Sequence, residues 1–238
     1  MNKITIPFYY INLEEDTERR KNMEEQLNKY VQKYYRIEAI NGKKYKNNNF
    51  VIDGIEYFFS KILKNPKARG CTLSHIKTFK KILEDKSDIS IICEDDLSFE
   101  LIDLWDTTLD DIIKDCPEDW GIIKLNTSSI KTLNYCFNLK NKKFINNKEI
   151  EKAFFKGINS STLCYLIKYE AVKEIWKNLF YNNKINFPEI NIIDYFLWEL
   201  TRVYNYYIPL FKSNEDTEKN KFGINSNNII KKFYDVKK

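Results

Sequence analysis

Two hydrophobic periods alternate along this chain and predict its secondary structure. Short runs rich in β-branched and aromatic residues are typical of strands, whereas longer segments with an apolar residue every three or four positions are typical of helices. The expected strands cover residues 4–13, 34–38, 89–93, 120–125, 162–167 and 203–208. The expected helices follow Asp16 up to residue 30, follow Gly70 up to residue 83, and cover residues 101–116, 169–180 and 192–202. Strands that alternate with helices predict an α/β fold, with a mostly parallel sheet flanked by helices on both sides.

The segments between these elements indicate how the chain is divided. Asn41-Gly42 is a turn signal, and the polar residues 126–152 are expected to form a loop or a hairpin. No internal repeat or flexible linker separates the elements, so residues 1–211 are expected to form a single domain. Residues 212–238 form a polar extension, whose last ten residues carry enough apolar side chains to dock as a short helix.

Composition and charge narrow the class of protein and its partners. Apolar residues make up 43% of the 238 residues and charged residues 31%, so burial of a core can offset the loss of chain entropy. The net charge of +5 suits an anionic partner such as a nucleotide or a membrane surface. Lys and Arg are scattered among Asp and Glu, however, and no nucleic-acid partner is expected.

The cysteines and the apolar segments indicate in which cellular compartment the protein is expected. Five cysteines at irregular spacings, without a CxxC pair, argue against a disulfide framework or a cysteine zinc cluster and favour a reducing compartment. The N-terminus lacks the apolar core and cleavage site of a signal peptide, and no window approaches ~18 uninterrupted apolar residues. We therefore expect a cytoplasmic protein without a transmembrane segment, able to contact an anionic membrane peripherally.

Residues 89–96, ISIICEDD, place three carboxylates directly after a continuous apolar run. Such a run predicts a strand buried on both faces, and ligands of open α/β sheets gather outside the carboxyl ends of such strands. Crowded carboxylates resist ionising together unless a cation offsets their charge, and an all-oxygen ligand set points to Mg²⁺ or Mn²⁺. In an extended segment Glu94 and Asp96 face one side, while Asp95 faces the other and anchors the loop. The alternative is that these acids cap a following helix or lie in solvent.

Several short blocks of the sequence stand in a characteristic order. They are YINL (10–13) followed by Arg19-Arg20, RIEAING (36–42), GCTLSH (70–75), IICEDD (91–96), STLCYL (161–166) with Ala171, and Asp194 before YFL (195–197). In this order and spacing, over about residues 8–210, the blocks resemble glycosyltransferase family 25, the lipooligosaccharide-type sugar transferases related to the collagen galactosyltransferases. Asn41 stands where the family usually has Asp, Ser161 where it favours Gly, and Cys164 where it favours Ala, and these departures bear on sugar or acceptor contacts more than on the fold.

This resemblance implies a GT-A-type nucleotide-sugar-binding fold, a UDP-sugar donor with galactose the commonest sugar, dependence on Mn²⁺, and transfer with inversion. At the matched positions, Asn12, Leu13 and Arg19 are expected to bind the uridine and its phosphates. Asp96 is expected to bind the metal, and Glu94 to bind the metal or the ribose. The other expected donor-site residues are Ala39, Asn41, Gly42, Ser74, His75 and Asp95.

Transfer with inversion needs a base that takes the proton from the acceptor hydroxyl. Asp194 is the expected base, because its apolar and aromatic neighbours in INIIDYFLWEL would raise its pKa by desolvation. Glu94 is the second expected catalytic carboxylate, and Glu189 is held in reserve. The alternative for Asp194 is an acid at a helix N-terminus that the helix dipole favours.

The chain has one histidine, His75. Several roles are open for it and for the residues within one helical turn of it. Cys71, four residues earlier, could reach it across one turn, although such a cysteine more often packs as a small apolar residue. Ser74 points about 100° away from His75 and cannot be its partner. A structural role is the alternative to donor binding for Ser74 and His75, and a solvated surface position is the alternative for Arg19.

Two other activities would also use an acidic cluster or a nucleotide site. A metal-dependent nuclease is one, but the acid-x-Lys pattern common in such sites is missing from GIIK (121–124). A relative that binds a nucleotide or a glycan without turnover is the other. If the chain is a transferase, its acceptor could be a lipid-linked saccharide such as a lipooligosaccharide, a glycan on a protein, or a hydroxylysine.

Overall fold

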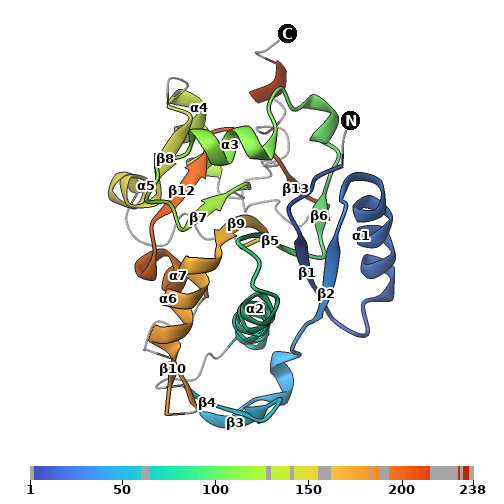
Figure 1. Ribbon diagram of the computed structural model, residues 1–238, viewed down its shortest axis with the longest axis vertical. Coiled ribbons are helices and arrows are strands. Elements are labelled where there is room, and N and C mark those ends of the chain that lie inside the picture. Colours follow the sequence, from blue (N-terminus) through green and yellow to red (C-terminus); the bar gives the residue numbers. More distant parts are fainter. Residues whose placement is uncertain are drawn as a thin grey trace.

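The secondary structure follows the alternation expected from the sequence (Figure 1). The computed structural model describes residues 3–59, 65–126, 130–139, 142–154, 162–182, 184–187, 193–214, 230 and 233–235. Its helices are α1 (Thr17–Tyr30), α2 (Pro66–Asp85), α3 (Leu109–Asp115), α4 (Ile130–Asn138), α5 (Asn147–Phe154), α6 (Tyr169–Leu179) and α7 (Ile193–Leu200), with the 3-10 helices η1 (Gly42–Lys44) and η2 (Ile102–Leu104). Its strands are β1 (Phe8–Asn12), β2 (Tyr34–Glu38), β3 (Asn49–Ile52), β4 (Ile55–Phe59), β5 (Ile89–Glu94), β6 (Leu97–Ser98), β7 (Ile122–Lys124), β8 (Phe144–Asn146), β9 (Cys164–Lys168), β10 (Phe180–Tyr181), β11 (Lys184–Phe187), β12 (Val203–Tyr206) and β13 (Lys212–Ser213).

A seven-stranded sheet forms the centre of the molecule, in the order β2-β1-β5-β9-β7-β12-β8. Strands β2, β1, β5, β7 and β12 run in one direction, whereas β9 and β8 run in the other. The expected α/β fold, a mostly parallel sheet flanked by helices, is confirmed. The reversed strand β9 lies between β5 and β7, so the sheet consists of two parallel groups joined by one antiparallel strand.

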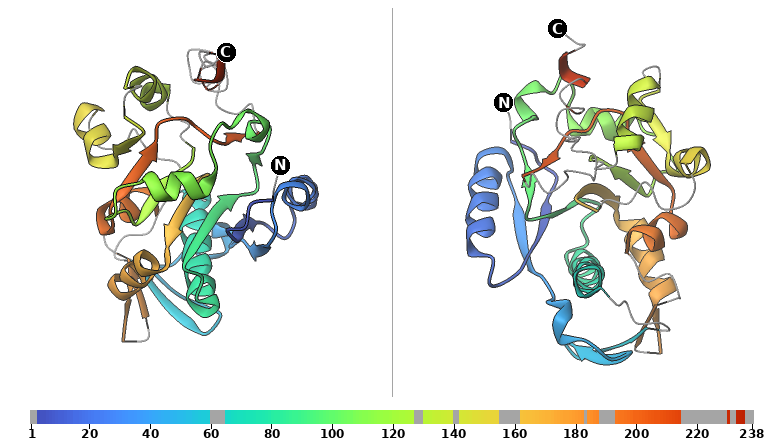
Figure 2. Two further views of the ribbon diagram at one scale, coloured as in Figure 1. Left: turned by 45° about the horizontal axis from the view of Figure 1, so that its top comes forward. Right: turned by 180° about the vertical axis from the view of Figure 1, so that it is seen from behind.

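Both faces of the sheet are buried, as the continuous apolar run of β5 predicts. On β1, Phe8 and Tyr10 belong to one core, whereas Tyr9 and Ile11 belong to the other. The first core also contains apolar side chains of α1, and the second contains those of α2 and α6. Helices α1 and α2 therefore cover opposite faces of the sheet, as Figure 2 shows from two further directions.

A smaller sheet, β10-β11-β4-β3, lies at one end of the molecule, at the bottom of Figure 1. β3 and β4 form a hairpin, and its turn residues Asp53 and Gly54 have φ angles of 51° and 76°. Positive φ at both central positions is what a two-residue hairpin turn requires, and it explains the Asp-Gly pair. The Asp53-Gly54 pair is a sequence signal for a hairpin, but the sequence analysis predicted no strand on either side of it.

Three of the predicted segments differ from the structure. The helix expected after Gly70 begins at Pro66, with the Asn65 side chain as its N-cap. Residues 101–116 do not form one helix, because η2 and α3 are separate and Thr108 begins α3 through a capping box with Asp111. Residues 126–152, predicted as a loop or a hairpin, contain α4, β8 and most of α5. These elements are short, and tertiary packing stabilises them more than their own propensity does. Their buried apolar side chains include Leu133, Cys136, Ile145 and Ile150.

The described residues beyond the predicted boundary at residue 211 pack onto the same body. β13 pairs with β6, and Ile230, Phe233 and Tyr234 belong to the core on the α1 face of the sheet. The Tyr234 hydroxyl donates a hydrogen bond to the carbonyl oxygen of Pro209 at 2.8 Å. The extension thus contributes buried side chains to the domain that precedes it.

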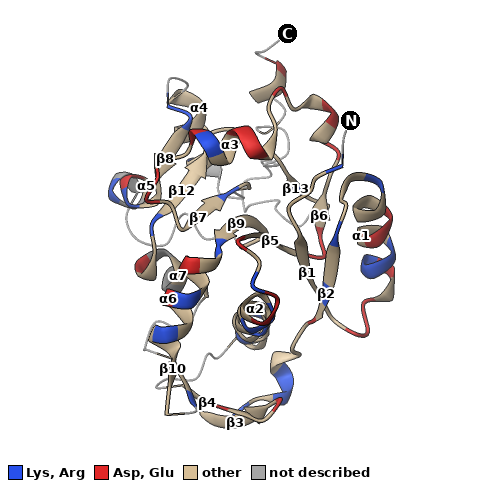
Figure 3. Cartoon of the chain, viewed as in Figure 1, with Lys and Arg blue, Asp and Glu red and all other residues tan. Residues whose placement is uncertain are grey.

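Charged residues of both signs are interspersed over the described chain. Figure 3 shows Lys and Arg beside Asp and Glu along α1, α2 and α6. None of the helices in the described ranges combines the length and the apolar character needed to cross a lipid bilayer.

Two glycines let the loop after β2 lie directly against the start of α2. A side-chain carbon on Gly42 would overlap the carbonyl oxygen of Pro66, and one on Gly70 would lie 2.5 Å from the carbonyl oxygen of Ile40. Ser74 links the loop to α2 through two hydrogen bonds. Its hydroxyl accepts from the Ile40 N–H at 2.8 Å and donates to the carbonyl oxygen of Gly70 at 2.7 Å.

Substitution Gly42→Ala is expected to lower the free energy of unfolding by ~1–3 kcal/mol, because the new methyl group overlaps backbone atoms that cannot move aside independently. Urea unfolding of the variant and the wild type measures the difference. Lys44→Ala, at an exposed position of the same loop, is the control and should stay close to the wild type. Equal stability of Gly42→Ala and the wild type would show that the loop does not pack tightly on α2.

Candidate active site

The carboxyl ends of three adjacent parallel strands meet at one edge of the central sheet. β2, β1 and β5 are neighbours, with Asn12 aligned with Glu38 and Ile11 aligned with Glu94. The chain leaves these strands toward different elements, α1 after β1, η1 after β2 and β6 after β5. Ligands of α/β sheets bind at such an edge, because the diverging connections leave a crevice there.

A hollow of about 560 Å³ opens at this edge, between the strand ends and the first half of α2. Its volume lies within the range of small-molecule sites, ~300–1,000 Å³. The predicted site residues that line it are Leu13, Arg19, Ala39, Asn41, Gly42, Ser74, His75, Glu94, Asp95 and Asp96. Asn12 lies beside them, because its amide nitrogen donates to Asp95. Residues from separate segments of the chain therefore converge on one site.

A second hollow, of about 550 Å³, lies at the amino end of β1. Ile4, Trp105 and Asp106 are among the residues that line it. None of the predicted site residues in the described part of the chain lines this hollow, so the first hollow is the candidate site.

Asp95 anchors the acidic turn to β1 and α1. Its Oδ2 accepts from Asn12 Nδ2 at 2.7 Å, and its Oδ1 accepts from Arg19 at 3.1 Å. Asn12 is held in turn by Arg20 and Arg36, which both donate to its Oδ1 at 3.1 Å. Burial raises the pKa of Asp95, although Asn12 and Arg19 act in the opposite direction. Both oxygens of Asp95 are occupied, so this carboxylate holds the loop in place.

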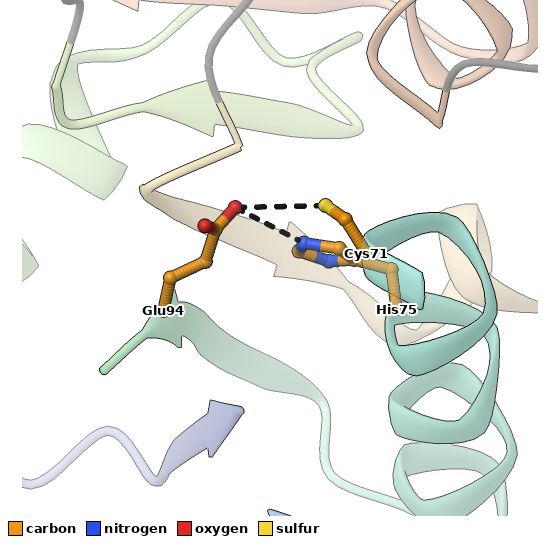
Figure 4. A group of neighbouring side chains, drawn as sticks. All are labelled: Cys71, His75 and Glu94. Atoms are coloured by element: carbon orange, nitrogen blue, oxygen red, sulfur yellow. Dashed lines mark hydrogen bonds and ion pairs between the residues drawn. The ribbon is translucent and has the colours of Figure 1, made fainter. Parts of the chain in front are cut away.

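Glu94, the last residue of β5, points toward α2. Thr162 donates to Glu94 Oε1 at 2.9 Å. Cys71 Sγ and His75 Nε2 each lie 3.7 Å from the same oxygen (Figure 4). Burial raises the pKa of Glu94, but His75, Thr162 and Cys71 together lower it by more, so its pKa lies below the ordinary value. Glu94 is therefore ionised at neutral pH, with 36% of its side chain exposed.

Within the described ranges, one carboxylate oxygen of Asp96 has no hydrogen-bond donor. Ser213 donates to its Oδ2 at 3.0 Å, but its Oδ1 is buried and has no partner among the described residues. Burial, followed by the negative charge of Glu94, raises the pKa of Asp96 to about 6. A buried carboxylate oxygen without a donor is costly unless a cation compensates its charge.

This arrangement fits a hard divalent cation such as Mn²⁺ or Mg²⁺. Asp96 offers an oxygen without a donor, and Glu94 offers a partly exposed carboxylate in the same hollow. Oxygen ligands of this kind are what both ions prefer. The acids do not cap a helix, because β6 follows them, so the helix-cap alternative is wrong.

The pH dependence of stability gives a test of the Asp96 environment. Its pKa is raised from 3.8 in the unfolded chain to about 6, so the folded state favours the protonated carboxyl. The contribution of Asp96 to stability is therefore complete below about pH 4 and is lost as the pH rises through about 6. Without added metal, Asp96→Asn should gain Tm relative to the wild type across this interval. A Tm difference that does not change with pH would contradict the raised pKa of Asp96.

Asn41 and His75 are fixed by contacts inside the wall of the hollow. Asn41 accepts from the Lys43 N–H at 3.1 Å as the cap of η1 and donates to Glu15 at 3.0 Å. His75 is fully buried, and its Nδ1 lies 2.8 Å from the Tyr165 hydroxyl. Both residues therefore shape the site through neighbours that come from other segments of the chain.

Asp194 is the second residue of α7, but its side chain lies outside the described residues, and Glu189 and Ser161 lie outside them altogether. The helix begins against α2, because the Ile193 N–H donates to Thr72 Oγ1 at 3.2 Å. Thr72 belongs to the same helical turn as the residues of α2 that line the hollow. The start of α7, and with it the backbone of Asp194, is therefore held against α2 at Thr72.

Three residues that were not predicted as site residues support the acids. Thr162 donates to Glu94, Ser213 donates to Asp96, and Arg36 donates to Asn12. Arg36 and Thr162 lie in the blocks RIEAING and STLCYL, which could have indicated them. Ser213 follows its partner by 117 residues in a polar segment that carries no motif, so no local signal could have found it.

A family model described as glycosyltransferase family 25 (LPS biosynthesis protein) matches residues 5–190. The chain is also similar to a solved structure described as a glycosyltransferase involved in the glycosylation of the major capsid of PBCV-1, with 10% identity and a TM-score of 0.37. That match covers 73% of this chain and 66% of the other, so the chain spans just under two thirds of that protein. No match was found among curated proteins. The family model covers well over half of the residues, and the chain therefore belongs to glycosyltransferase family 25.

Proposed function

We propose that this protein transfers a hexose, with galactose as the first candidate, from a UDP-sugar to a hydroxyl group of a glycan or protein-linked acceptor, with inversion. The observation that carries the proposal is the state of Asp96. In a member of a sugar-transferase family, Asp96 Oδ1 is buried and has no donor in the described part of the chain. It lies beside the ionised Glu94, in a hollow large enough for a nucleotide sugar. This pair is suited to hold the divalent cation that accompanies a diphosphate.

The donor would bind along the carboxyl ends of β1 and β2. The amide of Asn12 donates to Asp95 and to the carbonyl oxygen of Asp16, so Asn12 would act by holding the loop. Leu13 and Ala39 line the hollow with apolar surface, which suits a uracil ring. Arg19, Asn41, Gly42, Ser74 and His75 complete the wall.

Asp96 and Glu94 would hold Mn²⁺ or Mg²⁺ next to the diphosphate. When bound, the ion supplies positive charge that stabilises the diphosphate oxygens as the sugar leaves, an effect of several kcal/mol. Arg19 approaches the same region from α1, and its side chain is 42% exposed. Its guanidinium can donate to a phosphate while Asp95 orients it.

The acceptor hydroxyl would lose its proton to Asp194 as its oxygen forms the new bond to the anomeric carbon. α7, which carries Asp194, begins against Thr72 of α2, the helix whose neighbouring residues line the hollow. A lipid-linked saccharide, a protein glycan and a hydroxylysine are the acceptors to test. The net charge of +5 would assist contact with an anionic membrane that carries a lipid-linked acceptor.

A screen of nucleotide sugars against the protein with Mn²⁺ tests the donor class. The correct donor at 100 times its Kd should add ~2.7 kcal/mol to the free energy of unfolding and raise Tm accordingly. UDP release, measured with and without acceptor glycans, then tests turnover. No Tm shift with any UDP-sugar would contradict the proposal. A shift without UDP release would instead identify a binding protein, and Mn²⁺-dependent cleavage of nucleic acid would identify a nuclease.

A further inference from the structure

A cluster of three different ligand types lies on the α2 side of the hollow. The Cys71 thiol, a ring nitrogen of His75 and a carboxylate oxygen of Glu94 all lie within 4.8 Å of one another. Cys71 and His75 are four residues apart on α2, so their side chains share one face of the helix. Figure 4 shows both side chains directed at Glu94, which comes from the end of β5.

One ring nitrogen of His75, Nε2, is buried without a hydrogen-bond partner among the described residues. The whole side chain is fully buried. The other ring nitrogen, Nδ1, lies 2.8 Å from the Tyr165 hydroxyl. In the metal-free protein an Nε2–H directed at Glu94 Oε1, 3.7 Å away, favours the ionised carboxylate. In the other tautomer, which donates from Nδ1 to Tyr165, Nε2 has the lone pair that a metal ion needs. A metal-binding imidazole is usually oriented by a hydrogen bond from its second ring nitrogen, and the Tyr165 hydroxyl can accept that bond.

We propose that Cys71, His75 and Glu94 form a binding site for one Zn²⁺ ion. Around a tetrahedral Zn²⁺ with bonds of ~2.0–2.3 Å, the ligand atoms lie ~3.3–3.6 Å apart. Glu94 Oε1 is 3.7 Å from both Cys71 Sγ and His75 Nε2, and the ligand atoms of Cys71 and His75 lie within 4.8 Å of each other, so the three would draw together slightly around the ion. The Cys71 thiol loses its proton to solvent when the sulfur–zinc bond forms.

The ligand chemistry separates this site from the oxygen site at Asp96. Thiolate and imidazole favour Zn²⁺ strongly over Mn²⁺ and Mg²⁺, which prefer carboxylates, phosphates and water. The absence of a CxxC pair excludes a cysteine-rich cluster but does not bear on a site with one thiolate. The three ligands line the hollow, so the fourth position of the ion would face the donor site.

Zinc at this site would regulate the enzyme, a consequence that rests on the proposed function. Glu94 cannot give the same oxygen to Zn²⁺ and also support a divalent cation held by Asp96 without altering both sites. Zn²⁺ is therefore expected to inhibit Mn²⁺-dependent sugar transfer, and Cys71→Ser should need at least ~10-fold more Zn²⁺ for the same inhibition.

The site itself is tested by direct binding, with Co²⁺ as the probe for the metal-free protein. Wild type should bind one Co²⁺ with a thiolate-to-cobalt charge-transfer band in the near ultraviolet, and one equivalent of Zn²⁺ should abolish the band. Cys71→Ser, nearly isosteric at a partly exposed position, should lose the band and bind Zn²⁺ at least ~10-fold more weakly. Cys116→Ser, which removes a buried thiol elsewhere, should keep the band.

A second pair of variants keeps the test independent of folding and of the transferase proposal. His75→Gln should lose the charge-transfer band, and its Tm and circular dichroism spectrum check that the variant is folded. Asp96→Asn should keep the band. The inference is overturned if the wild type shows no band, or if Cys71→Ser binds Zn²⁺ as tightly as the wild type. A charge-transfer band without any sugar transfer would support the zinc site and contradict the proposed function. Sugar transfer without the band would support the proposed function and contradict the zinc site.

Discussion

Asp96→Asn is expected to lower the rate of sugar transfer at least ~100-fold, because it removes a ligand of the divalent cation that stabilises the leaving diphosphate. The structural reason is specific to this carboxylate. Asp95 uses both oxygens to hold the turn, and Glu94 accepts from Thr162, but Asp96 keeps Oδ1 buried without a donor among the described residues. UDP release at saturating donor and Mn²⁺ measures the effect.

Stability separates this loss from misfolding. Asparagine has nearly the same shape as aspartate and carries no charge, and the pKa of Asp96, raised to about 6, means that the ionised carboxylate disfavours the metal-free fold at neutral pH. The variant should therefore unfold at the same or a higher Tm without metal, while its affinity for Mn²⁺ falls. Asp103→Asn, at an exposed position of η2, is the matched control for loss of a carboxylate. Near-normal turnover of Asp96→Asn would exclude Asp96 as a metal ligand.

Asp194→Asn is expected to lower kcat by ~100- to 10,000-fold, because the acceptor hydroxyl would lose its general base. The affinity for UDP should stay close to that of the wild type, since the predicted uridine and phosphate contacts, Asn12, Leu13 and Arg19, come from the end of β1 and from α1. The position of α7 favours this role. Its first N–H donates to Thr72, so the helix begins beside the turn of α2 that lines the hollow.

Two outcomes would contradict the assignment of Asp194 as base. Loss of UDP binding would place Asp194 at the donor, and a lower Tm with unchanged kcat would indicate that it only stabilises the N-terminus of α7 through the helix dipole. Glu199→Gln, at an exposed position of the same helix, is the control for a changed charge and should affect neither quantity strongly.

Local patterns predicted the elements that build the site. The run ISIIC indicated a strand buried on both faces, and β5 occupies residues 89–94 with the acids at its carboxyl end. The four-residue spacing of Cys71 and His75 placed both on one face of α2, as observed. The sequence could not reveal the reversed direction of β9, because the apolar run of a strand does not depend on the direction of its neighbours.

The directions of the three carboxylates were not predictable in the same way. The alternation of side chains holds only within an extended strand, and β5 ends at Glu94, after which Asp95 and Asp96 form a turn. Each acid then takes its own partner. Asp95 bonds to Asn12, 83 residues earlier, and Asp96 bonds to Ser213, 117 residues later.

By itself, then, the sequence determined the order of strands and helices, the burial of both sheet faces and the presence of acids at a strand end, since periodicity is a property of neighbouring residues. Only the tertiary structure decided which carboxylate is fully bonded, which keeps an oxygen without a donor among the residues that the structure describes, and which lies beside Cys71 and His75. The physical reason is that hydrogen bonding and desolvation depend on contacts between segments that are far apart in the sequence. Local sequence patterns do not specify those contacts.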